Sequence, residues 1–220
     1  MDELKFNKQK LALVVSLLLF VGFIVMVWGV SFYRPWIAEL DRFGNELFRL
    51  EMSEVGVSLI YSFTQIGNIR TLLLTALVVS IVLFYREGKY CFLWFGFSMG
   101  IAGGGAPLLM KNVIQRARPV DGLMTRSGYS FPSGHTMGSL ALYGLIIILA
   151  AIYIKKVWLR YVVMVGSFMI ILIISWSRIH LGFHFLSDIM GSFFFGLSLL
   201  IVAWQILLKV NGATNSYKEL

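Results

Sequence analysis

Charged residues are scarce in this sequence, and cysteine occurs only once. Only 14% of the 220 residues are charged, whereas 58% are hydrophobic, and the mean hydropathy is +0.81. These fractions lie far outside those of an ordinary soluble domain and exclude that class. Because Cys91 is the sole cysteine, an internal disulfide is impossible, and the cysteine count indicates no redox compartment. The composition predicts a membrane protein.

Repeats, low-complexity segments and linkers are also missing, so we expect residues 1–220 to form a single transmembrane domain. The glycine triplet at 103–105 is not followed by the Lys-Ser or Lys-Thr pair of a phosphate-binding loop, which disfavours that function. Gly96, Gly100 and Gly104 recur at every fourth residue, a spacing that favours close approach of another helix. We interpret these three glycines as packing positions.

Long apolar runs predict the transmembrane helices. Crossing a hydrocarbon layer of ~30 Å takes about 20 helical residues, and runs of roughly that length occupy 11–33, 90–110, 136–154 and 189–208. Two shorter runs, at 71–85 and 161–177, are bounded by charges and are also expected to span. The first run is too long for a signal peptide and lacks a small-residue cleavage site, so it should remain as an anchor. The sequence therefore predicts an all-α integral membrane bundle of about six transmembrane helices.

An amphipathic pattern lies between the first two spans. Its apolar residues follow helical spacing at Trp36, Leu40, Phe43, Leu47 and Leu50, with charged residues between them. We expect an interfacial helix that either packs over the bundle or guides lipid into a site. The apolar segment 53–69 is interrupted by polar residues and is interpreted as a buried extension of the second span.

The distribution of basic residues predicts the orientation. With a cytoplasmic N-terminus, the inner segments carry ten Lys and Arg residues against four acids, and the outer segments carry nine against seven. The short basic loops at 86–89 and 155–160 follow the positive-inside rule, although ten and nine differ little. We expect a multi-pass cell-membrane protein with cytoplasmic N- and C-termini.

Three polar clusters interrupt the oily sequence: KNVIQRARP at 111–119, SGYSFPSGH at 127–135 and SRIHLGFHFLSD at 177–188. In the expected topology all three lie at the extracytoplasmic face. Each alone has a simpler explanation, as snorkelling cations, a turn with a helix N-cap, or a buried His–Asp pair. Their coincidence at one membrane face favours a functional site, because ionisable residues near lipid are costly.

The residue types in these clusters suit a phosphate. Lys111, Arg118 and Arg178 supply one ammonium and two guanidinium groups for its oxygens. Ser133 and the Gly134 N–H add donors at the start of a helix, where the dipole is positive. The sequence therefore predicts an anion pocket.

The histidines add chemistry to that pocket. His184 and Asp188 are four residues apart and share a face if the helix begins early enough, so the carboxylate can keep one imidazole nitrogen protonated and the other nucleophilic. His135, from another helix start, is the natural proton donor to the leaving group. Ser133 is disfavoured as a nucleophile, because the cations around it suit a dianion better than a carbonyl.

The motifs Lys111-(six residues)-Arg118-Pro119, Pro132-Ser133-Gly134-His135 and Ser177-Arg178-(five residues)-His184-(three residues)-Asp188 resemble the three-part signature of the phosphatidic acid phosphatase type 2 superfamily. Six spans in a short chain are most similar to its bacterial phosphatidylglycerophosphatase B type. The resemblance implies a metal-independent phosphohydrolase that works through a phosphohistidine and needs no cofactor. It implies that His184 is the nucleophile, His135 the acid and Asp188 the orienting residue. Phosphate binding is implied for Lys111, Arg118, Ser133, Gly134 and Arg178.

The chain departs from the family pattern at His180, where an aromatic or aliphatic residue is expected, and at Phe185-Leu186, which replace a polar or proline-containing pair. His180 and His184 also have the spacing of two zinc ligands on one helix, although Arg178 would repel a metal ion and Asp188 is needed by His184. A non-hydrolytic phospholipid-headgroup binding or transport protein is a further alternative. It does not require the two site histidines.

Expected partners are the bilayer and a lipid phosphate substrate, with no nucleic acid and no obligate protein partner. The substrate class comprises phosphatidylglycerol phosphate, phosphatidic acid and isoprenyl or undecaprenyl diphosphate. The sequence does not rank these lipids, nor water against another phosphoryl acceptor.

Overall fold

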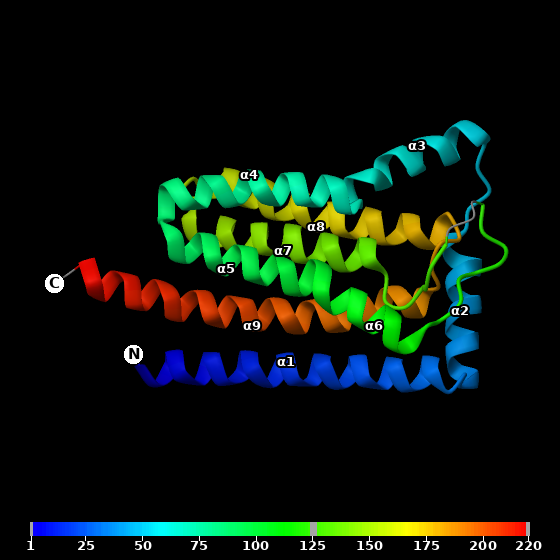
Figure 1. The fold of residues 1–220 in the computed structure, drawn as a ribbon, viewed down its shortest axis with the longest axis horizontal. Coiled ribbons are helices and arrows are strands. Elements are labelled where there is room, and N and C mark those ends of the chain that lie inside the picture. Colours follow the sequence, from blue (N-terminus) through cyan, green and yellow to red (C-terminus); the bar gives the residue numbers. More distant parts are fainter. Residues whose placement is uncertain (1, 124–126, 219–220) are drawn as a thin grey trace.

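Six helices in the described part of the chain are long and apolar enough to cross a membrane. The computed structural model describes residues 2–123 and 127–218. Its spans lie side by side in one bundle (Figure 1) and occupy Gln9–Ser31, Ile69–Glu87, Lys89–Ile114, Gly134–Tyr153, Val157–His180 and Leu186–Lys209. The predicted all-α class and the six predicted spans are confirmed.

The elements follow one another along the chain without strands in the described residues. In order they are α1 (Asp2–Ser31), α2 (Pro35–Phe48), α3 (Glu54–Thr64), a 3₁₀ turn (Gln65–Gly67), α4 (Ile69–Glu87), α5 (Lys89–Met99), a π-helical segment (Gly100–Gly105), α6 (Ala106–Ile114), α7 (Gly134–Tyr153), α8 (Val157–His180) and α9 (Leu186–Lys218). The third span therefore consists of α5, the π-helical segment and α6.

Helix α7 is the centre of the bundle. In its 18-residue apolar stretch 67% of the residues are buried, whereas only 17% are buried in the corresponding stretch of α1 and of α8. Small residues let its neighbours approach closely: a Cβ on Gly138 would lie 2.5 Å from Leu72 of α4, and one on Gly144 would lie 2.4 Å from Leu200 of α9. The apolar sides of α1 and α8 instead face outward, as expected for helices in contact with lipid.

Helix α2 crosses one end of the bundle at a steep angle to the spans (Figure 1). Its buried residues are Ile37, Asp41 and Gly44. Trp36, Phe43 and Leu47 are exposed on its other side, at 36%, 54% and 51%. The apolar stripe thus points away from the protein, which is the arrangement of a helix lying in the membrane interface.

The expectation for residues 53–69 is wrong. The segment is a separate helix, α3, whose N-cap Ser53 accepts a hydrogen bond from the Gly56 N–H, and Asn68 caps α4 in the same way. Val55 and Leu59 of α3 are 69% and 66% exposed. Two independent caps start two helices, so this segment is not a buried extension of the second span.

The packing interpretation of the glycine stripe is also wrong. No described residue comes within 4 Å of a Cβ placed on Gly96, Gly100 or Gly104. The glycine that meets α7 is Gly103, where an added Cβ would lie 3.3 Å from Ala141. The π-helical segment changes the register of the third span, so the four-residue spacing does not continue along one face.

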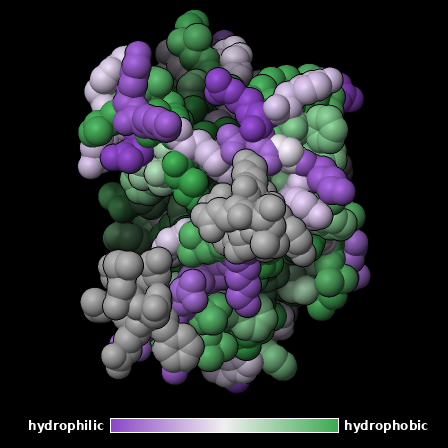
Figure 2. All heavy atoms as spheres, turned by 90° about the vertical axis from the view of Figure 1, so that its left-hand side faces the viewer, coloured by the Kyte–Doolittle hydropathy of each residue, from purple (hydrophilic) through white to green (hydrophobic). Residues whose placement is uncertain are grey.

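The two ends of the bundle differ in character. The three polar clusters and α2 lie at one end, and the turns between α4 and α5 and between α7 and α8 lie at the other, with the described N- and C-terminal ends of the chain (Figure 1). Figure 2 shows hydrophilic side chains on this second end, beside the hydrophobic flanks of the helices. The predicted placement of all three clusters at one face of the membrane agrees with this arrangement.

Candidate active site

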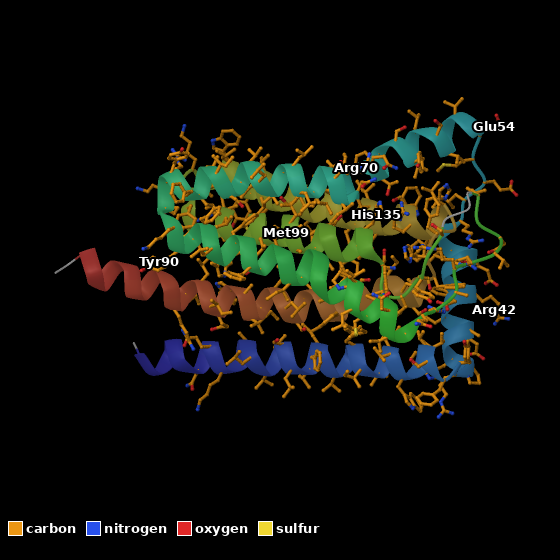
Figure 3. The ribbon with its side chains drawn as sticks, viewed as in Figure 1. Arg42, Glu54, Arg70, Tyr90, Met99 and His135 are labelled. Carbon is orange, nitrogen blue, oxygen red and sulfur yellow. The ribbon has the colours of Figure 1, made fainter. Side chains whose placement is uncertain are left out.

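The residues of the predicted site come from the ends of four helices and the segments beside them. Lys111 lies in the last turn of α6 and Arg178 in the last turn of α8. Ser133 is the N-cap of α7, which begins with Gly134 and His135. His135 is 7% exposed and lies inside the end of the bundle that α2 crosses (Figure 3).

Lys111 and Arg118 connect the first two clusters. The Lys111 ammonium donates hydrogen bonds to the carbonyl oxygens of Tyr129 at 2.6 Å and Ser130 at 3.2 Å. Arg118 donates to the carbonyls of Gly128 and Tyr129, both at 3.0 Å. These bonds fix the segment before α7 against the segment after α6.

Arg118 also reaches the third cluster. One of its amino groups, Nη1, donates to the Phe183 carbonyl at 2.7 Å and lies 3.2 Å from His184 Nε2. Because a guanidinium has no acceptor, Nε2 must be the acceptor in that contact. The lone pair of His184 therefore points toward Arg118, one of the predicted phosphate ligands.

The other nitrogen of His184 meets Asp188. The distance from Nδ1 to Asp188 Oδ2 is 3.2 Å, and both side chains are almost completely buried. Helix α9 begins at Leu186, so His184 precedes the helix and the expected shared helical face is not formed. The contact is made across the helix start instead, where Oδ2 also accepts the Phe185 N–H at 3.0 Å.

Ser133 has the structural role of a cap. Its hydroxyl oxygen accepts from the Thr136 N–H at 3.4 Å and from the Thr136 hydroxyl at 3.1 Å, and the side chain is fully buried. The hydroxyl proton of a capping serine is still available for donation. Gly134 lies near Lys111, whose Cε would be 3.8 Å from an added Cβ.

The Arg178 side chain is fully buried. It donates to the Thr64 hydroxyl at 3.1 Å, and its guanidinium carbon lies 4.2 Å from the centre of the Phe183 ring. Thr64 ends α3 and also accepts from Ser177 at 2.9 Å. The end of α3 thus supports one of the predicted phosphate ligands.

His180 does not form the arrangement expected of a zinc ligand with His184. Helix α8 ends at His180, so the two histidines do not share a helix. The His180 ring stacks on the Trp176 ring with 5.0 Å between the ring centres. The Leu50 N–H donates a hydrogen bond to His180 Nδ1 at 3.3 Å. The residue holds the connection between α2 and α3.

Two further contacts order this end of the bundle. Arg49 donates to the Asp121 carboxylate at 2.6 Å, and this hydrogen bond holds the pKa of Asp121 below its usual 3.8. Gly182 has φ of +71°, and a Cβ there would lie 2.3 Å from the Gly122 backbone. Position 182, in the turn between Arg178 and His184, therefore accepts only glycine.

Sequence reasoning missed a buried charge network beside His184. Arg116 donates from Nη1 to Asp188 Oδ1 and to the Ser187 hydroxyl, both at 2.6 Å, and from Nη2 to Asp41 Oδ2. Its guanidinium carbon lies 4.2 Å from the ring centre of Phe185, one of the two departures from the family pattern. The only sequence signal was the position of Arg116 two residues before Arg118. Asp41 gave none, because charged residues surround it on α2.

A cavity of about 490 Å³ adjoins the site. Its walls come from the end of α1, from α2, and from Arg116, Arg118 and Phe185. Arg118 is the predicted phosphate ligand that borders this space.

The comparisons with known proteins agree with the motifs. The PAP2 superfamily matches residues 92–211. Phosphatidylglycerophosphatase B of Bacillus subtilis (strain 168) is 33% identical over 124 residues, which cover 53% of this chain and 57% of that protein. The aligned region thus spans little more than half of the relative's length.

The fold has a counterpart among solved structures. The crystal structure of the first transmembrane PAP2 type phosphatidylglycerolphosphate phosphatase from Bacillus subtilis superposes with a TM-score of 0.76, at 22% identity, over 89% of this chain and 96% of that one. At that identity the likeness concerns the fold. Since the family match covers more than half of the sequence and includes all three motifs, the chain belongs to the PAP2 superfamily.

Proposed function

We propose that this protein is an integral membrane phosphatase that removes the terminal phosphate of lipid phosphates through a phosphohistidine at His184. The observation that carries the proposal is the environment of the His184 ring. Asp188 lies 3.2 Å from Nδ1, and Arg118 lies 3.2 Å from Nε2. A neutral imidazole with its lone pair toward a phosphate-binding cation is arranged as a nucleophile.

In the first step the phosphate is held by Lys111, Arg118 and Arg178, with donors from Ser133 and Gly134 at the α7 N-terminus. His184 Nε2 forms a bond to phosphorus as the bond from phosphorus to the leaving oxygen breaks. That oxygen is the lipid alkoxide oxygen of a monophosphate or the bridging oxygen of a diphosphate. His135 gives that oxygen its proton. The three cations stabilise the charge on the phosphoryl oxygens, and Asp188 stabilises the positive imidazole.

In the second step water releases the phosphate. His135, now neutral, takes a proton from the attacking water, and the new oxygen–phosphorus bond replaces the bond to His184. Inorganic phosphate leaves, and both histidines return to their starting forms. Fixed cations supply the charge that a divalent metal provides in other phosphatases, so the proposal includes metal independence.

The membrane location supports an amphiphilic substrate. The site lies at the end of the spans beside the interfacial helix α2 (Figure 1), a position that a phosphate headgroup can reach from the bilayer. Phosphatidylglycerol phosphate, phosphatidic acid and undecaprenyl diphosphate all have this chemistry. We place the site at the extracytoplasmic face and the termini in the cytoplasm, because the opposite turns are basic.

The test is phosphate release by the purified protein in detergent micelles from these three lipids, each compared with the His184→Ala variant. We expect release from at least one lipid by the wild type and none by the variant. Binding of the lipids without phosphate release would contradict the proposal and favour a headgroup-binding or transport protein.

A further inference from the structure

Arg116 lies between two carboxylates from different helices. It donates to Asp188 of α9 at 2.6 Å through Nη1 and to Asp41 of α2 through Nη2. The exposed side-chain fractions are 12% for Arg116, 8% for Asp41 and 0% for Asp188. A buried carboxylate keeps its charge only with a close, hydrogen-bonded cation, and Arg116 provides this for Asp188.

The contacts of Asp188 divide between its two oxygens. Oδ1 accepts from Arg116, whereas Oδ2 faces His184 Nδ1 and accepts the Phe185 N–H. The hydrogen bond to Oδ1 therefore sets the rotation of the carboxylate about its Cβ–Cγ bond. That rotation decides whether Oδ2 points at the imidazole.

Asp41 completes the arrangement from the interfacial helix. Its Oδ1 accepts from the Ser187 N–H at 3.0 Å and from the Ser187 hydroxyl at 2.6 Å. The Ser187 N–H belongs to the first turn of α9, where helix N–H groups have no partner within the helix. A carboxylate of α2 thus caps the helix that carries Asp188, and the favourable helix dipole adds to this contact.

Close packing holds α2 in this position. A Cβ on Gly44 would lie 2.4 Å from Leu186 Cβ, so the two helices touch at the residue that begins α9. The opposite side of α2 exposes Trp36, Phe43 and Leu47 toward the membrane interface. The His184–Asp188 pair is therefore attached to an element that lies at the bilayer surface.

We propose that Asp41 and Arg116 are positioning residues, through which α2 holds the Asp188 carboxylate in register with His184. The proposal rests on the proposed function, since it concerns the same phosphoryl transfer. Its rival is that Arg116, which borders the cavity beside Arg118, is a further phosphate-binding cation. The two carboxylates bound to Arg116 favour positioning, because they balance its charge.

The test compares kcat and KM of Asp41→Asn and wild type on one lipid phosphate that the wild type hydrolyses, in mixed micelles. Outer partners that orient a metal-bound histidine typically contribute about 10- to 100-fold to affinity or activity, and by analogy we expect a fall of that order in kcat. KM should stay within about twofold, because substrate binding is not altered. Glu46→Gln is the matched control: it removes a carboxylate from the same helix, at a side chain 70% exposed, and should leave kcat unchanged.

Variants at Arg116 supply the decisive comparison. Arg116→Gln should lower kcat at least as much as Asp41→Asn, and Arg116→Lys should recover part of the loss because it restores the charge without the two-pronged geometry. Adding Asp41→Asn to Arg116→Gln should cost less than about twofold more, because two residues that act through one contact are not additive. A merely structural role of Asp41 predicts additive losses.

Several results would overturn the inference. They are an unchanged kcat in Asp41→Asn, a raised KM with normal kcat in Arg116→Gln, and additive losses in the double variant. If Asp41→Asn does not elute as a folded protein in size exclusion, Ser187→Ala removes one of the same contacts, and an unchanged kcat there contradicts the inference equally. A wild type that releases no phosphate refutes the proposed function instead.

Discussion

His184 and Asp188 meet across the start of α9, with Nδ1 3.2 Å from Oδ2, although only Asp188 belongs to the helix. Asp188→Asn should therefore fold but lose activity, by about 10²- to 10⁴-fold, because an amide neither stabilises the positive imidazole nor keeps its tautomer. Phosphate release, together with size exclusion as the folding control, measures this. Activity within a few-fold of wild type would show that the pair does not act in catalysis.

The role of His135 can be separated from phosphate binding by the choice of leaving group. A lipid alkoxide needs a proton as it departs, and a positioned acid contributes about 10²- to 10⁴-fold. His135→Ala should slow lipid monophosphates most, lipid diphosphates less, and a nitrophenyl phosphate least, because phenolate is a stable leaving group. Equal slowing of all three would mean that His135 binds phosphate or supports the fold.

Activity should not depend on a divalent metal. In the proposed mechanism Lys111, Arg118 and Arg178 supply the positive charge, so phosphate release should persist in excess chelator. Vanadate should inhibit, because its five-coordinate form resembles the transition state and suits the same cations. Complete loss of activity in chelator, restored by one divalent metal, would falsify metal independence.

The orientation in the membrane can be tested with single cysteines in a Cys91→Ser background. Val120 is fully exposed at the active-site end, and Lys155 lies in the exposed turn between α7 and α8 at the other end. Neither residue has a positive φ, so a cysteine fits the backbone at both positions. Val120→Cys should react with an impermeant thiol reagent from outside intact cells, and Lys155→Cys should not. The reverse pattern would place the site in the cytoplasm.

The spans and the motif residues could be predicted because lipid imposes strong rules. Apolar runs of about 20 residues have few alternatives to a membrane helix. Ionisable residues such as Arg118 and His184 are costly near lipid, and the number and order of the spans put them at one end of the bundle, so their gathering there was predictable.

Details that depend on packing could not be predicted. The inward direction of Asp41 follows from the close contact of Gly44 with Leu186, which no pattern within α2 indicates. Gly103 rather than Gly104 meets α7 because of a π-helical segment, whose extra residue per turn has no sequence signature here. The late start of α9 likewise depends on contacts of Ser187 with α2.

The measurement that tests the account most directly is trapping of the phosphoenzyme. A brief quench after mixing with substrate labelled in the terminal phosphate should leave label on the wild-type protein and none on His184→Ala. His180→Ala serves as the control, because His180 contacts the α2–α3 connection rather than the predicted phosphate ligands, and it should retain label. Label on His184→Ala would contradict the account and direct attention to another nucleophile, with Ser133 the first to examine.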